Sequence, residues 1–482
     1  MVSCGRRIAS VARPARLLPA LTAVPLTLTL AALTACGAGV HGVPGGSGVR
    51  DPYFPKAGNG GYDVSHYGLR LAYTPDAHHL TGTATLTARA TKGLSAFNLD
   101  LRGLKVEAVT VGGVAARWNR AGQELTVRPR DDIRQGERFR VTVRYSGAPE
   151  TVTDPDGSEE GWLRTTDGVL ALGEPTGSMT WFPGNHHPSD KAAYDLTVTV
   201  PRGLQAVSNG ELRSETTANG RTTFRWHTAE PMASYLATLA IGDFDISRSR
   251  TGDGLPLYTA VDPAETEASR PVLGRIPEVL RWAERRFGPY PFSAGGAIVD
   301  RAPEVGYALE TQSRPVFPDA PDMTFLVHEF AHQWYGDSVT PRSWRDMWLN
   351  EGFATYAEWL WEEDHGGEST QETFDALYSG DYFDTEEDGE AIWEFPPAEP
   401  PDAARISEPP VYLRGAMVLQ QVRQAVGDDG FWRILRGWAA EYRHGNAGTD
   451  DFTRFVEKQA PGVDFDGIWE DWLYGEGKPE RG

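Results

Sequence analysis

Two histidines and a glutamate near the middle of the 482-residue chain have the residue types and spacing of a metal site. His328, Glu329 and His332 form an H-E-x-x-H sequence. At 3.6 residues per turn the two histidines lie about 40° apart on one face of a helix, so both imidazoles can bind one metal ion. Glu329 lies on the flank of that face, where it can reach a metal-bound water without being a ligand.

A third ligand must come from another segment. Glu351 follows His332 after eighteen intervening residues, in the sequence NEGFA at 350–354. It reaches the metal if a second helix begins there and packs antiparallel to the first. Two histidines and one carboxylate with one open position form a catalytic zinc site. The sequence therefore predicts one Zn2+ bound by His328, His332 and Glu351, with Glu329 as general base.

A surface helix is the alternative interpretation of the H-E-x-x-H sequence. Its apolar neighbours argue against that, because two histidines and a glutamate are costly to bury unless a metal or other partners satisfy them. Pro321 in the first turn and Gly336 at the end give the predicted helix its boundaries. A metzincin zinc site is excluded, since it needs glycine three residues after the second histidine and Tyr335 occupies that position.

The two metal-binding segments resemble those of a known family. The pairing of H-E-x-x-H at 328–332 with WLNEGFA at 348–354 is similar to the gluzincin zinc aminopeptidases typified by aminopeptidase N and the leukotriene hydrolase. Further matches run from about residue 60 to about residue 425. The resemblance implies an α+β fold, with an antiparallel, saddle-like β domain followed by a thermolysin-like, mainly helical zinc-peptidase domain. It also implies an aminopeptidase whose substrates are peptides with a free N-terminus.

Three further residues take roles from this resemblance. Tyr412, in YLRGA at 412–416, is similar to the tyrosine of the family's Tyr-x-Lys-Gly-Ala, which stabilises the oxyanion. Glu310 resembles the family's glutamate in Gly-Ala-Met-Glu-Asn, which binds the free α-amine, although the surrounding residues are Tyr, Leu and Thr here. Glu174 is similar to the second anchor of the family's Gln-x-Glu, with Leu172 in place of the glutamine.

The first 35 residues are predicted to be a lipoprotein signal peptide. Arginines precede an apolar run from Leu17 to Leu33, and the sequence LTAC then resembles a bacterial lipobox that ends at Cys36. An uncleaved membrane anchor is the alternative, weakened by Pro19 and Pro25. Both interpretations place the remaining chain outside the cytoplasm. We expect a secreted protein held at the bacterial cell membrane by lipid on Cys36.

Charge and cysteine content limit the other partners. The formal net charge is -21, and it becomes about -25 without residues 1–35, which carry four arginines and no acid. Such a surface repels nucleic acid, so no nucleic-acid partner is expected. The only cysteines are Cys4 and Cys36, so no disulfide can form within the mature protein.

Composition and periodicity divide the chain into four parts. After the signal peptide, residues 36–60 are rich in glycine and proline and are predicted to be a flexible tether. Residues 61–247 contain short alternating apolar runs separated by turn residues, which predicts an antiparallel β domain. Residues 248–482 are predicted to form the catalytic domain, with one helix over 263–287, a loop-rich segment over 367–410 and short C-terminal helices.

Two other functions compete with an aminopeptidase. The first is an endopeptidase or another hydrolase with the same zinc site. The second is a non-catalytic surface binding protein whose zinc is structural or absent. Structural zinc sites are normally closed by four protein ligands, whereas this sequence offers three ligands and a base. The larger helical C-terminal domain usual in the family has no counterpart in the sequence, so either the site is more open or the helices after Tyr412 close it.

Overall fold

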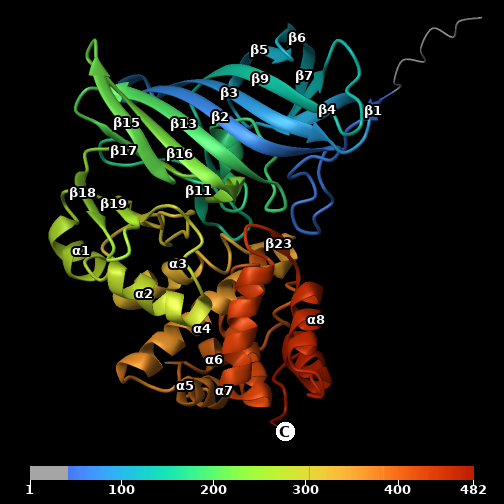
Figure 1. The fold of residues 1–482 in the computed structure, drawn as a ribbon, viewed down its shortest axis with the longest axis vertical. Coiled ribbons are helices and arrows are strands. Elements are labelled where there is room, and N and C mark those ends of the chain that lie inside the picture. Colours follow the sequence, from blue (N-terminus) through green and yellow to red (C-terminus); the bar gives the residue numbers. More distant parts are fainter. Residues whose placement is uncertain (1–41, 303, 384, 482) are drawn as a thin grey trace, which may run out of the picture. The chain divides into compact units, whose positions relative to one another are not determined.

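The computed structural model describes residues 42–302, 304–383 and 385–481. A β-rich domain is followed by a mainly helical domain (Figure 1), which confirms the predicted fold class. The predicted signal peptide and Cys36 lie outside the described residues. Among the helices that are described, none is both long enough and apolar enough to cross a membrane.

An eight-stranded sheet forms the main layer of the β domain. All neighbouring strands are antiparallel except β13 and β2, which are parallel. The predicted alternation holds, because Tyr67, Leu69, Leu71 and Tyr73 of β2 are all buried on one face. In spatial order the strands are β15 (Glu211–Ala218), β16 (Arg221–Ala233), β13 (Lys191–Pro201), β2 (Tyr62–Thr74), β3 (His79–Ala90), β9 (Arg138–Gly147), β5 (Lys105–Val111) and β6 (Val114–Ala115).

Two smaller sheets complete this domain. One has the order β1 (Val43–Pro44), β4 (Leu94–Asp100), β8 (Glu124–Arg128) and β7 (Arg117–Ala121). The other has the order β10 (Thr151–Thr153), β11 (Glu159–Arg164), β12 (Val169–Leu172), β17 (Leu239–Gly242) and β14 (Gln205–Ser208). Because Glu174 follows β12 by two residues, this five-stranded sheet positions it.

The helical domain begins with a four-stranded sheet of β18 (Asp245–Arg250), β19 (Pro256–Val261), β20 (Gly295–Val299) and β21 (Val316–Phe317). The single helix predicted over 263–287 is instead two, α1 (Thr266–Leu273) and α2 (Ile276–Phe287). Pro277 lies in the first turn of α2. Proline has no backbone N–H to continue a preceding helix, so the chain restarts there.

The helices that follow pack around the two metal-binding segments. They are α3 (Met323–Ala331), α4 (Trp348–His365), α5 (Thr370–Ser379), α6 (Glu386–Ala391), a π-helical turn (Pro410–Arg414), α7 (Gly415–Glu441), α8 (Thr449–Gln459) and a second π-helical turn (Ile468–Leu473). The prediction of a loop-rich segment over 367–410 is wrong where α5 and α6 lie. Ser369 and Glu372 form a capping box that starts α5, and Phe374 and Leu377 bury its apolar face.

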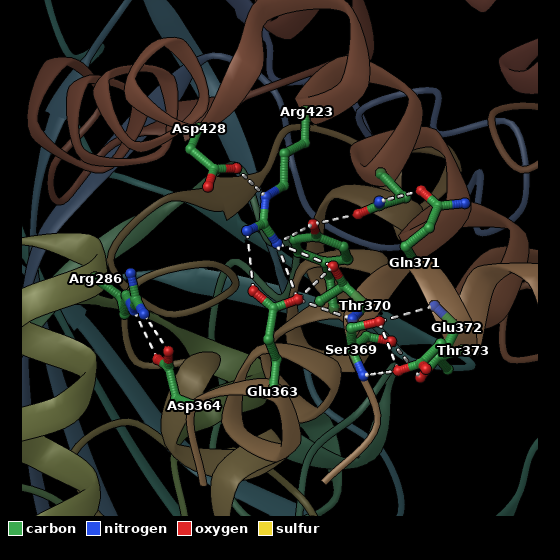
Figure 2. Close-up of polar contacts among 12 residues, drawn as sticks. Arg286, Glu363, Asp364, Ser369, Thr370, Gln371, Glu372, Thr373, Arg423 and Asp428 are labelled. Atoms are coloured by element: carbon green, nitrogen blue, oxygen red, sulfur yellow. Dashed lines mark hydrogen bonds and ion pairs between the residues drawn. The ribbon is translucent and has the colours of Figure 1, made fainter. Parts of the chain in front are cut away.

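A polar network fixes the C-terminal end of α4 (Figure 2). Arg423 of α7 donates hydrogen bonds to Glu363 of α4, at 2.9 Å, and to Thr370 of α5, at 2.9 Å. Arg286 of α2 pairs with the neighbouring Asp364. Two arginines from two other helices therefore neutralise Glu363 and Asp364 at this end of α4.

Residues 42–60, assigned to a tether from their composition, pack on the folded body. Strand β1 pairs with β4, and the buried Asp51 accepts hydrogen bonds from Ser343 Oγ at 2.8 Å and from Trp344 N at 3.0 Å. His187 Nε2 of the β domain lies 3.3 Å from the same carboxylate. Asp51 thus contacts both domains. Phe54 also packs against Trp344, with 5.9 Å between ring centroids. These contacts have no regular apolar period, so a helix or strand pattern does not reveal them.

Candidate active site

Helix α3 carries both predicted histidine ligands. It begins after Asp322, whose side chain accepts a hydrogen bond from Phe325 N, so Pro321 precedes the helix instead of lying in its first turn. The helix ends at Ala331, before the predicted end at Gly336, because the backbone then tightens into successive turns. His328 and His332 consequently lie at its C-terminal end, facing α4.

The three predicted ligands meet at one point. His328 Nε2 lies 3.2 Å from Glu351 Oε2, and His332 Nε2 lies 3.4 Å from the same oxygen. One ligand atom from each residue falls within 4.8 Å of the other two. Two imidazole nitrogens and a carboxylate oxygen at this spacing suit a single zinc ion.

Hydrogen bonds from the far side of each imidazole ring fix the orientation of both histidines. His328 Nδ1 lies 2.5 Å from Glu358 Oε1, and His332 Nδ1 lies 2.8 Å from Asn350 Oδ1. Each Nδ1 donates to its oxygen, which leaves both Nε2 atoms as acceptors pointing to the centre. Sequence reasoning missed Glu358. It follows Glu351 by seven residues, two turns along the same helical face, and that spacing is the signal that could have found it.

The electrostatics of the three ligands favour a cation between them. Burial alone would lower the pKa of His328, but its contacts with Glu351 and Glu358 raise that pKa well above its usual value. Burial would likewise raise the pKa of Glu351, yet His332 and His328 lower it to about 2. Without a metal, protons on the imidazoles supply the positive charge that the carboxylate requires. The donor set therefore fits a divalent cation.

Glu329 is buried beside the histidines and is not one of the ligands. Its Oε2 has no hydrogen-bond partner among the described residues. Burial raises the pKa of Glu329 to about 8, against the lowering effect of His328 and His332. A carboxylate that lines a cavity next to a metal site and has a free oxygen can accept a proton from a water held there.

The cavity at this centre has a volume of about 550 Å³. It brings together all the site residues predicted from the sequence. They are Glu174, Glu310, His328, Glu329, His332, Glu351 and Tyr412. No lysine or arginine is among the described residues that line it. The cavity is therefore strongly acidic, apart from the histidines and whatever cation they bind.

Glu310 is linked to the metal ligands through one amide. Asn350 Nδ2 donates to Glu310 Oε1 at 3.0 Å, while Asn350 Oδ1 accepts from His332. The backbone oxygen of Glu310 also accepts from Gln333 Nε2 at 3.0 Å. These bonds hold the Glu310 carboxylate at a fixed place beside the zinc site. Asn350 was noted in the sequence only as part of a motif, and the structure gives it this bridging role.

Glu174 reaches the same cavity from the β domain. Glu160 accepts hydrogen bonds from Thr176 N and Gly177 N, which holds the turn that follows Glu174. Glu174 Oε1 has no partner among the described residues. Burial, and then the negative charge of Glu310, raise the pKa of Glu174 well above its usual range. The two carboxyls line the same cavity and repel each other's negative charge.

Tyr412 lies in the π-helical turn Pro410–Arg414, and its ring stacks beside His328 with 6.2 Å between centroids and 17° between planes. A close backbone contact brings this turn to α4. A Cβ added at Gly352 would lie 2.8 Å from the carbonyl carbon of Gly415, which is closer than side chains tolerate. The glycines therefore let the helix with Glu351 and the turn with Tyr412 touch.

Comparison with known proteins identifies the family. Residues 63–236 match the Peptidase M1 N-terminal domain, and residues 320–472 match the Peptidase family M1 domain. The solved structure of the M1 zinc metallopeptidase from Deinococcus radiodurans is 30% identical, with a TM-score of 0.81, and the alignment covers 90% of this chain and 98% of that one. The chain belongs to the M1 peptidase family. The predicted zinc cofactor is thereby confirmed, and the metalloprotease class with it.

Other relatives of this M1 family member are aminopeptidases. Glutamyl aminopeptidase of Sus scrofa is 24% identical over 86% of this chain and 47% of its own length. Leucyl aminopeptidase of Saccharolobus solfataricus is 25% identical over 64% of this chain and 41% of its own length. The chain thus spans about half, or less, of these curated relatives. A variant of the Deinococcus enzyme has been solved with a Tyr-Ser-Ala substrate bound, again at 30% identity and a TM-score of 0.81.

Proposed function

We propose that this chain is a zinc aminopeptidase, which removes the first residue from peptides with a free N-terminus. The observation that carries the proposal is the position of Glu310 and Glu174. Both line the cavity that holds the zinc ligands, and no described lysine or arginine lines it to neutralise them. A substrate ammonium group is the natural partner for carboxylates arranged in this way.

Each site residue then has one task in peptide hydrolysis. His328, His332 and Glu351 would hold the zinc ion, which would supply Lewis acidity toward the scissile carbonyl and the attacking water. Glu329 accepts the proton of the attacking water and passes it to the leaving amine. Tyr412 donates a hydrogen bond to the oxygen that becomes negative in the transition state.

Glu310 decides between exopeptidase and endopeptidase action. A base beside zinc attacks any peptide carbonyl that lies against it, so cutting after the first residue requires a group that fixes the free amine. Pairing of Glu310 and Glu174 with that amine contributes roughly 2 to 5 kcal/mol, or about 30- to 5,000-fold in kcat/KM. Relatives named as glutamyl and leucyl aminopeptidases support this function.

The test compares free and N-acetylated peptides on the purified zinc enzyme. We expect acetylated peptides to be poor substrates. We also expect Glu310→Ala to lose most of its kcat/KM on free peptides while retaining zinc. Asp156→Ala, which removes an exposed acid at the rim of the same cavity, is the matched control and should retain activity. Equal cleavage of acetylated and free peptides would replace this proposal with an endopeptidase. Zinc binding without any turnover would favour a binding protein.

We further propose that the protein is exported and held at the cell membrane by lipid on Cys36. The arginines, the apolar run and LTAC at 33–36 support this localisation. Mass spectrometry of the mature N-terminus should find lipid on Cys36, and Cys36→Ser should release the protein or leave it unprocessed. Cys4→Ser, within the predicted signal peptide, is the control and should change nothing. An unmodified chain that starts elsewhere would contradict the proposal.

A further inference from the structure

Arg414 is a fully buried arginine in the same π-helical turn as Tyr412. Its guanidinium donates to backbone oxygens only. Nε donates to Trp472 O at 3.0 Å, and Nη2 donates to Asp471 O at 3.0 Å and to Gly475 O. Nη1 donates to Phe395 O at 3.4 Å. No described acid forms an ion pair with it by side-chain contact.

Three of these four carbonyls belong to one segment near the C-terminus, the π-helical turn Ile468–Leu473 and the residues after it. This segment is itself held in place. Trp472 packs on Phe374 and Tyr378 of α5, and Tyr378 Oη donates to Pro479 O at 2.8 Å. The C-terminal segment is therefore a fixed support for Arg414.

The geometry of an arginine suits this position. A planar guanidinium presents five N–H groups in fixed directions, so it can bind several carbonyls at once, whereas a lysine ammonium is a single point of charge with three donors. In the family motif Tyr-x-Lys-Gly-Ala, which residues 412–416 resemble, a lysine occupies the position of Arg414. Trp393 covers the guanidinium at 5.7 Å from its ring centroid.

Tyr412 is two residues from Arg414, and the turn is fixed on both sides. The Gly352–Gly415 contact presses it against α4, and Arg414 ties it to the C-terminal segment. We propose that Arg414 is a positioning residue, which holds the turn so that the Tyr412 hydroxyl stays aligned with the reacting carbonyl. This inference rests on the proposed role of Tyr412 in peptide hydrolysis.

A double-mutant cycle on the zinc enzyme tests the proposal, using the parent, Tyr412→Phe, Arg414→Lys and the double variant. Tyr412→Phe should lower kcat with little change in KM, because its hydrogen bond forms in the transition state. Arg414→Lys should lower kcat by roughly 10- to 100-fold, the cost of a misplaced catalytic group. In the Tyr412→Phe background, Arg414→Lys should have no further effect on kcat.

Arg423→Lys is the matched control, since Arg423 lies on α7, beyond the turn, and binds Glu363 and Thr370 away from the cavity. It should leave kcat unchanged even if the Tm falls. Trp393→Leu is a second variant, which loosens the cover of Arg414 without removing it, and should lower kcat in the same Tyr412-dependent way. Equal losses of kcat in both backgrounds would overturn the positioning role alone. A Tyr412→Phe variant with parental kcat would overturn both this inference and the oxyanion role.

Discussion

The two ends of helix α4 carry similar acids in opposite surroundings. In its first half and at its middle, Glu351 and Glu358 line the cavity, and their ion-pair partners are histidines. At its other end, Glu363 and Asp364 are each paired with an arginine from another helix, as Figure 2 shows. Neighbouring acids of this set are at most seven positions apart on one helix, so the difference between them lies in the partners that other elements supply.

This contrast separates acids that stabilise the fold from acids that serve the active site. A fixed guanidinium neutralises a carboxylate permanently and adds rigidity. A carboxylate without such a partner retains its affinity for mobile cations, which here are zinc and, in the proposed function, the amine of a substrate. This distinction predicts that substitutions near the cavity change activity or zinc binding, whereas substitutions at the arginine-paired end of α4 change stability.

The largest effect should come from the base. Glu329→Gln is expected to lower kcat by about 10²- to 10⁴-fold, because the amide cannot accept the proton from water. Zinc content, measured by metal analysis, should match the parent, since Glu329 is not a ligand. Glu363→Gln at the paired end should leave kcat unchanged. Parental activity in Glu329→Gln would contradict the assignment of the base.

Removal of the arginine at the paired end should act on stability. Arg423→Met removes the guanidinium that pairs with Glu363 and Asp428, while Thr370 still donates to Glu363, and the free energy of unfolding should fall by about 2 kcal/mol. Urea unfolding followed by circular dichroism measures this change. The exposed pair Arg270–Glu267 offers a control, and Arg270→Met should cost less than about 1 kcal/mol. Equal losses of unfolding free energy in Arg423→Met and Arg270→Met would contradict the distinction between the partly buried pair and the surface pair.

A substitution at Glu358 tests the part of α4 that contacts the histidines, without removing a metal ligand or the base. Glu358→Ala deletes the acceptor for His328 Nδ1, so the ring loses its fixed orientation. The zinc dissociation constant should rise by roughly 10- to 100-fold. Competition with a chelator of known affinity measures it, and Glu362→Ala, on the same helix and outside the cavity, is the control. An unchanged zinc affinity would show that the Glu358 contact is dispensable.

The smallest effect concerns a buried group with no acid partner. Burial lowers the pKa of His186 from 6.5 to about 4, and the hydrogen-bond partners of its ring among the described residues are Ser234 Oγ and Phe182 O. Between pH 6.5 and about 4 the unfolded state therefore binds the extra proton. The free energy of unfolding should fall as the pH decreases through this window, by at most about 1.4 kcal/mol per pH unit from this residue. Urea unfolding at pH 7 and pH 5 should show a smaller difference for His186→Gln than for the parent, while exposed His79→Gln should match the parent.

The sequence predicted the fold class and the residues that meet in the cavity. Zinc chemistry restricts residue types and spacing, which identified the three ligands and Glu329, whereas Tyr412, Glu310 and Glu174 were identified through the family resemblance.

Glu358 was missed, because its seven-residue spacing from Glu351 points to the same helical face but does not show that the carboxylate reaches His328. The packing of residues 42–60 was also missed, because its contacts, such as those of Asp51 with backbone amides and a hydroxyl, have no regular apolar period. Helices α5 and α6 were missed because acidic and proline-rich composition outweighed short capping signals.

The Gly352–Gly415 contact has a consequence for how this scaffold can change. The distance between the backbone of the helix that carries Glu351 and the backbone that follows Tyr412 is set at Gly352 and Gly415, where no side chain lies between them. Substitutions in the loops at 154–158 and 305–308, which also line the cavity, leave that distance untouched. Substrate range can therefore be redesigned in those loops while the reaction geometry is inherited from the helix crossing.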